Sequence, residues 1–133
     1  MSLTEAQLQQ FSLVFTAPGS PVHDLVASTN DPEADEMARS IWADFRGELV
    51  PRLESLGQRD LDPKEFREEL HALRGISSQF GLFLLEVLLF AWEKKESDPV
   101  GATARYLPAS LAIARLSLDV IEDDFPHLKS SHG

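Results

Sequence analysis

The sequence predicts an all-α protein, an antiparallel up-down four-helix bundle with an additional helical segment at its N-terminus. Apolar residues recur at helical spacing in four long stretches, and no stretch alternates apolar and polar residues as a half-buried strand does. The breaks between stretches are short and rich in Pro, Gly and Asp, so successive helices are expected to be antiparallel neighbours. At 133 residues the chain is long enough for one compact domain but hardly for two.

Residues 1–32 are expected to form a helical cap on the bundle. Thr4 is a suitable N-cap for a helix over residues 4–15, which is followed by a breaker containing Pro18 and Pro21. A short helical piece is expected to follow around residues 22–27. The apolar side chains available for covering the bundle are Leu8, Phe11, Leu13, Val14 and Phe15.

Residues 33–125 carry the four helices of the predicted bundle. The first begins at Asp31 and Pro32, because proline is favoured in a first helical turn and acidic residues follow at the positive end of the helix dipole. Pro51 is expected to bend it before it ends in a turn over residues 57–62. Its predicted core stripe consists of Ala34, Ala38, Ile41, Phe45, Leu49 and Leu56.

The second helix begins at Asp62, a favoured N-cap residue that is followed by proline, and ends at a bend or break around Gly81. The third runs on to about Lys95. Residues 80–92 are apolar except for two positions, but these 13 residues fall short of the roughly 20 needed to cross a bilayer. We therefore expect a central helix that is buried on more than one side.

A loop over residues 96–101 precedes the last helix, which is expected to stop near Phe125. Pro108 is a possible kink within it. Residues 126–133 are expected to form a flexible tail, because a proline follows the helix and few apolar residues remain.

Composition narrows the class of partner. The chain has 12 Lys and Arg against 22 Asp and Glu, a net charge of −10, which disfavours nucleic acid and anionic membrane surfaces because both require a concentrated basic face. The absence of cysteine excludes disulfides and thiolate chemistry. The first residues lack the basic start and apolar core of a signal peptide. A cytoplasmic protein is the expectation.

His71 is the most informative residue. At about 100° per residue, the helix over residues 64–80 points His71 about 140° away from the centre of its core stripe, toward solvent. The stripe consists of Phe66, Leu70, Leu73, Ser77 and Phe80, and the face that His71 shares consists of Lys64, Arg67, Arg74, Gly75 and Ser78.

An exposed imidazole among cations suits phosphoryl chemistry. Arg67 and Arg74 lie one turn before and after His71, within side-chain reach, and cations stabilise an attached phosphoryl dianion. Gly75 and Gly81 are unfavourable in a helix, which suggests that something approaches the backbone there. The alternative, that both arginines pair with surface acids such as Glu68 and Glu69, stays open.

Glu93 is a candidate for orienting the imidazole. If the helices on either side of Gly81 form an antiparallel hairpin, His71 lies level with residues 91–93. Glu93 could then accept a hydrogen bond from Nδ1–H and leave Nε2 as the attacking nitrogen. The alternative is a solvated glutamate beside Lys94 and Lys95.

These residues resemble the histidine-containing phosphotransfer (HPt) domain family. That family has a histidine, a lysine three positions later, a glycine at four, small residues next, a glycine at ten and a glutamate at about twenty-two, with an apolar residue at fourteen. The resemblance covers roughly residues 33–124. The matching positions here are His71, Arg74, Gly75, Ser77, Ser78, Gly81, Leu85 and Glu93.

The resemblance implies that His71 is a phosphoacceptor. The cations on its helix face, Arg74, Arg67 and Lys64, are expected to stabilise the phosphoryl group, and Gly75, Ser78 and Gly81 are expected to give access. Such a domain is a phosphocarrier without catalysis of its own. It needs no cofactor and no metal, since Mg²⁺ is expected only on the partner. The implied partners are a response-regulator receiver domain, a histidine kinase or both, and the chain is expected to be a monomer or weak homodimer.

Two positions depart from the family pattern. Arg74 replaces the usual lysine, which keeps the charge but adds a planar fork. Ile76 replaces a small residue. Two alternatives therefore remain: a non-phosphorylated HPt-like adaptor that binds receivers or kinases, and a helical protein-interaction domain without signalling chemistry. A di-iron bundle is disfavoured because Glu-x-x-His does not occur on two helices.

Overall fold

The computed structural model describes Val14, residues 18–58 and residues 60–132, without the side chains of residues 130–132. All the regular secondary structure in these ranges is helical, which confirms the all-α prediction. The expected helix over residues 4–15 lies outside the described residues except for Val14, which is buried. That helix therefore stays a prediction.

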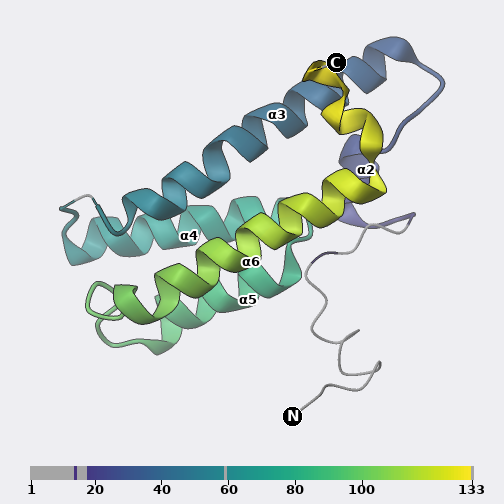
Figure 1. The fold of residues 1–133 in the computed structure, drawn as a ribbon. Coiled ribbons are helices and arrows are strands. Elements are labelled where there is room, and N and C mark those ends of the chain that lie inside the picture. The colour runs from purple at the N-terminus through teal and green to yellow at the C-terminus, as the bar shows by residue number, and fades with distance from the viewer. Residues whose placement is uncertain (1–13, 15–17, 59, 133) are drawn as a thin grey trace.

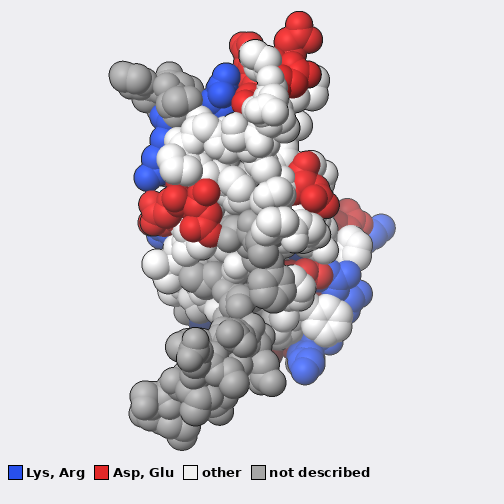
Figure 2. Space-filling model, turned by 90° about the vertical axis from the view of Figure 1, so that its right-hand side faces the viewer, with Lys and Arg blue, Asp and Glu red and all other residues white. Residues whose placement is uncertain are grey.

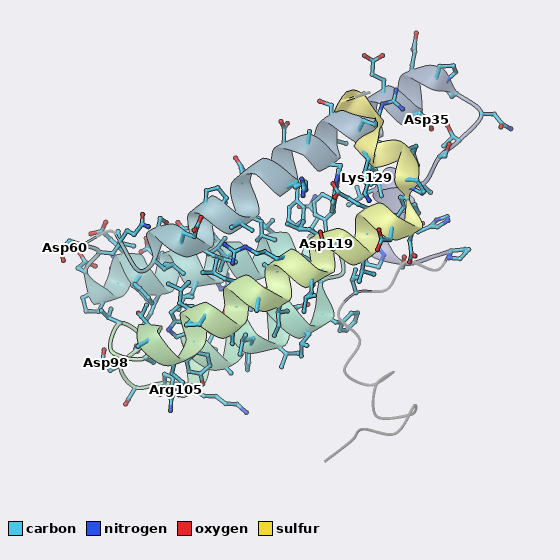
Figure 3. All side chains as sticks on the ribbon, viewed as in Figure 1. Asp35, Asp60, Asp98, Arg105, Asp119 and Lys129 are labelled. Atoms are coloured by element: carbon cyan, nitrogen blue, oxygen red, sulfur yellow. The ribbon has the colours of Figure 1, made fainter. Side chains whose placement is uncertain are left out.

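Successive long helices run in alternating directions (Figure 1). The side-chain view places Asp60, in the turn after α3, and Asp98, in the loop before α6, at one end of the molecule, with Asp35 at the other (Figure 3). α4 packs along α5, and α3 packs along α6. The elements are α2 (Pro21–Val26), α3 (Pro32–Ser55), α4 (Pro63–Gln79), α5 (Phe83–Phe90), the π-helix η1 (Ala91–Lys95), α6 (Thr103–Asp124) and the 3-10 helix η2 (Pro126–His132).

Aspartate side chains start α3 and α4, the second of which carries His71. Asp31 accepts a hydrogen bond from the amide of Glu33 at the start of α3, at 3.0 Å. Asp62 accepts one from the amide of Glu65 at the start of α4, at 2.8 Å, and this bond holds the pKa of the Asp62 carboxyl below its usual range. Both helix starts are as predicted, because an N-cap is a local interaction. α3 continues through Pro51 to Ser55.

Gly81 ends α4 in a Schellman motif. Its amide donates to the carbonyl of Ser78 at 3.0 Å, and the amide of Leu82 donates to the carbonyl of Ser77 at 2.9 Å. This motif needs a left-handed residue, and Gly81 has a φ of 71°. Gly81 is buried, and a side chain there would contact Pro21. The expectation that Gly81 gives access to a partner is therefore wrong, because its role is to turn the chain.

The core lies among α3, α4, α5 and α6. Aromatic rings fill it: Phe45 stacks on Phe80 with ring centroids 3.9 Å apart, and Trp92 stacks on Tyr106 at 5.6 Å. The indole of Trp92 also donates to the carbonyl of Pro99 at 2.8 Å, which satisfies its buried N–H.

α5 is not buried on more than one side, contrary to the sequence expectation. Leu85 and Leu89 are fully buried, but Phe83 is 44% exposed, Val87 60% and Phe90 42%. The three exposed residues recur at helical spacing on one face, which α5 turns to solvent because the core covers only its other face. We call Phe83, Val87 and Phe90 the α5 strip.

The C-terminal segment also differs from expectation. Residues 126–132 form η2 rather than a frayed tail. Leu128 is buried in the core, and the imidazole Nε2–H of His127 donates to the carbonyl of Val26 at 2.7 Å. Both contacts join η2 to segments that are distant in the sequence. A local pattern of residues therefore does not predict them.

The described surface near α2 has no single continuous acidic patch. Figure 2 looks onto the end of the molecule that carries α2, where acidic side chains form separate groups with uncharged surface between them.

No described helix is both long and apolar enough to span a membrane.

α2 is expected to contribute to the stability of the whole domain, because Val22 and Val26 are completely buried. Val26→Ala should lower the free energy of unfolding by about 2 kcal/mol, the loss expected for two buried methyl groups. Val87→Ala removes the same atoms from an exposed position and should change stability by less than about 0.5 kcal/mol. Urea denaturation of both variants measures the difference. Equal midpoints for the two variants would contradict integral packing of α2.

Candidate functional site

His71 lies in the middle of α4 with its side chain 62% exposed. The residues predicted for the core stripe of this helix, Phe66, Leu70, Leu73 and Ser77, are all buried. The predicted outward orientation of His71 is therefore confirmed. It follows from helical periodicity alone.

Glu93 comes from η1 and lies beside the imidazole, where the hairpin around Gly81 predicts it. Its Oε2 atom is 3.3 Å from Nδ1 of His71. The Glu93 side chain is only 6% exposed, and its remaining neighbours are the guanidinium of Arg74 and the ammonium of Lys94, each at 3.4 Å. A buried carboxylate needs such partners. The alternative of a solvated glutamate is excluded.

Arg74 is held against the same imidazole. Its Nη2 atom is 3.2 Å from Nδ1 of His71, and its guanidinium lies 5.1 Å from the centre of the Phe90 ring. This cation–π contact and the Glu93 carboxylate fix the position of the guanidinium. Glu69, one of the surface acids considered as a partner for Arg74, instead binds Arg52 at 2.6 Å.

One predicted phosphoryl-stabilising residue, Arg67, binds elsewhere than at the imidazole. The guanidinium of Arg67 donates to the carbonyls of Glu93, at 2.8 Å, and Ser97, at 3.3 Å. Lys64 lies in the first turn of α4, seven residues before His71 and about 10 Å away along the helix axis, so its role toward the phosphoryl group stays a prediction. The helical period places Arg67 and Lys64 on the same face of α4 as His71. The direction of the Arg67 side chain is decided by its bonds to η1 and the loop that follows it.

A shallow cavity of about 570 Å³ opens beside His71. A side chain added at Gly75 would meet no atom within 4 Å, so the backbone of α4 is open to a partner there. The apolar wall of this cavity has no signal in the sequence, because residues 83–90 are apolar nearly all round and their spacing does not show which face stays exposed. The lining consists of His71, Arg74, Gly75 and Ser78 from α4 and of Glu86 and the α5 strip from α5.

A second cavity, of about 620 Å³, lies between α3, α6 and η2. Figure 3 labels two of its lining residues, Asp119 on α6 and Lys129 on η2. Its buried carboxylate, Glu122, is bound by the indole of Trp42 and the guanidinium of Arg46, both at 3.1 Å. It is slightly larger than the His71 cavity, but its lining contains no histidine. We therefore assign the candidate site to His71.

Within the described part of the chain, no three His, Asp or Glu side chains form a group that could hold a metal ion. No protein-family model matches the sequence, and neither a curated protein nor a solved structure has significant similarity to it. Function is therefore inferred from the geometry around His71.

Proposed function

We propose that this protein is a histidine phosphotransfer protein of the HPt type. It relays a phosphoryl group between a kinase or receiver-domain aspartate and another receiver, through His71. In this proposal α3, α4, α5 with η1, and α6 are the helices of an antiparallel four-helix bundle. The observation that carries it is the exposed imidazole of His71, with its Nδ1 atom 3.3 Å from the buried carboxylate of Glu93.

The transfer step follows from that contact. Nδ1–H donates to Glu93, which leaves the Nε2 lone pair free to attack the phosphorus of an aspartyl phosphate. The N–P bond forms, the P–O bond to the aspartate breaks, and its electron pair returns to the aspartate carboxylate. The ring gains positive charge, and the Glu93 carboxylate stabilises it. The receiver supplies Mg²⁺, and the reverse reaction uses the same contacts.

The surface beside the imidazole supports docking of a receiver. Gly75 leaves space above α4, and the α5 strip offers apolar area next to the nucleophile. Arg74 is close enough to turn a donor toward the incoming phosphoryl group. Exposed apolar groups beside an open backbone are typical of a protein-binding surface.

The test is phosphoryl transfer to the full chain. The protein is incubated with Mg²⁺ and each phosphorylated receiver of its organism in turn, and intact mass measures the addition of one phosphoryl group. We expect a single label that is labile in acid and stable in base, as a phosphoramidate is. Absence of label with every receiver and kinase would exclude phosphotransfer.

A second candidate function is a non-phosphorylated adaptor. The contact of 3.2 Å between Arg74 and Nδ1 of His71 favours it, because a guanidinium can only donate. If that bond dominates, the ring proton lies on Nε2 and the nucleophile is lost, while the α5 strip can still dock a receiver. Receiver binding without labelling would identify the adaptor. If the protein neither binds a receiver nor accepts the label, the remaining alternative is a helical protein-interaction domain without signalling chemistry.

Arg74→Ala is expected to slow transfer more than it affects folding. Removing a charge-assisted contact to the phosphoryl group should cost about 1.5–3 kcal/mol, which is a rate loss of roughly 10- to 150-fold. Loss of the cation–π contact with Phe90 and of the ion pair with Glu93, which keeps Lys94 as a partner, should lower stability by about 1–2 kcal/mol. Single-turnover transfer and thermal unfolding measure the two effects. Arg74→Lys should retain most of the rate. A large stability loss with normal transfer would make Arg74 a structural residue.

A further inference from the structure

The π-helix η1 gives Glu93 its position. Trp92 and Glu93 are consecutive, yet both are buried, while Lys94 and Lys95 are exposed. A π-helical turn contains an extra residue, so it changes the direction in which the following side chains project. η1 therefore directs Glu93 inward to Nδ1 of His71.

Arg67 binds this turn where the helix ends. Glu96 has an extended backbone, so the carbonyls at the end of η1 lack the amide donors that a continuing helix would supply. The guanidinium of Arg67 donates to the carbonyl of Glu93 at 2.8 Å and to that of Ser97 at 3.3 Å. A side chain from α4 thus fastens the turn that carries Glu93.

Two groups compete for Nδ1 of His71. Glu93 can only accept a hydrogen bond from it, and Arg74 can only donate one to it. The contact with Glu93 at 3.3 Å therefore requires a proton on Nδ1, whereas the contact with Arg74 at 3.2 Å requires the proton on Nε2. The two contacts cannot be hydrogen bonds at the same time. The position of Glu93 decides which one forms.

The burial of Glu93 favours the first state. Its Oε1 atom is buried without a hydrogen-bond partner, the nearest cation being Arg74 at 3.4 Å. Loss of the donor at Oε2 would leave a buried carboxylate with still fewer partners, which is unfavourable.

We propose that Arg67 is a positioning residue that sets the tautomer of His71. By holding η1, it keeps Glu93 at Nδ1, so that the ring proton stays on Nδ1 and the lone pair on Nε2. Without Arg67, the carbonyl of Glu93 in η1 and that of Ser97 just beyond it lose their guanidinium donor, Glu93 withdraws, and Arg74 donates to Nδ1. The proton then lies on Nε2. The consequence for phosphoryl transfer rests on the proposed function, but the tautomer itself does not.

The experiment is NMR of the ¹⁵N-labelled imidazole in the full chain, where two-bond ¹H–¹⁵N correlations distinguish the two tautomers. It is done near pH 8.5, above the ordinary range of histidine ionisation. We expect the Nδ1–H form in the parent protein and a shift toward Nε2–H in Arg67→Ala. Arg67→Lys keeps one donor and should restore part of the parent signal. Glu93→Ala removes the acceptor at Nδ1 and should abolish the Nδ1–H preference directly.

The matched control is Arg52→Ala. Arg52 also joins two helices through its guanidinium, by binding Glu69, but it does not touch η1. Its loss should leave the tautomer unchanged. An Nε2–H form in the parent protein, or a parent tautomer retained in both Arg67→Ala and Arg67→Lys, would overturn the proposal.

Phosphotransfer assays add a second readout. Arg67→Ala should lower the maximal transfer rate at least about tenfold, with receiver affinity unchanged, because the docking surface is intact. A parent protein that accepts no phosphoryl group would defeat the proposed function, while the NMR result would still decide the role of Arg67.

Discussion

His71→Gln is expected to abolish phosphoryl acceptance, by more than about a thousandfold, because the amide side chain has no nucleophilic nitrogen. The protein should remain folded, with stability changed by less than about 0.5 kcal/mol, since the imidazole is mostly exposed. Intact mass after incubation with a phosphorylated receiver and Mg²⁺ measures acceptance, and urea denaturation measures stability.

His23→Gln is the control for this variant. His23 is half-buried in α2, where its ring meets Phe125 edge-on, and it lies outside the cavity beside His71. The control should accept the phosphoryl group at the rate of the parent protein. A label that survives His71→Gln would show that another residue is the acceptor.

Gly75→Glu is expected to abolish receiver docking while stabilising α4. Any side chain stabilises a helix interior relative to glycine, here by about 0.5–1 kcal/mol, and the space at Gly75 is open. The same carboxylate would occupy the cavity one turn from His71 and repel both a phosphoryl group and an acidic receiver site. A more stable protein that no longer binds its receiver is the expected result. Calorimetry for binding and thermal unfolding for stability test it.

Gly47→Glu provides a close control. Gly47 lies inside α3, and a side chain there also meets no atom within 4 Å. It should gain similar stability without losing receiver binding. Gly75→Ala adds only a methyl group and should retain most of the affinity. Unimpaired binding by Gly75→Glu would show that the partner surface lies elsewhere on the protein.

Local patterns in the sequence were enough for the framework of the site. The starts of α3 and α4 follow from Asp31 and Asp62, because an N-cap bonds only to the residues just after it. The outward direction of His71 follows from the helical period, and the level of Glu93 follows from counting residues on either side of the turn at Gly81. These features depend on spacing along the chain.

Only the tertiary structure decided what the exposed and long side chains contact. Arg67 was placed on the correct face of α4, yet its partners are the carbonyl of Glu93 in η1 and that of Ser97 just beyond it, and that π-helix has no simple sequence signal. The exposure of the α5 strip and the burial of Leu128 depend on which segments cover them. Periodicity specifies the direction in which a side chain leaves its own helix. The neighbour that it meets is set by the packing of segments far apart in the chain, so no local pattern can report it.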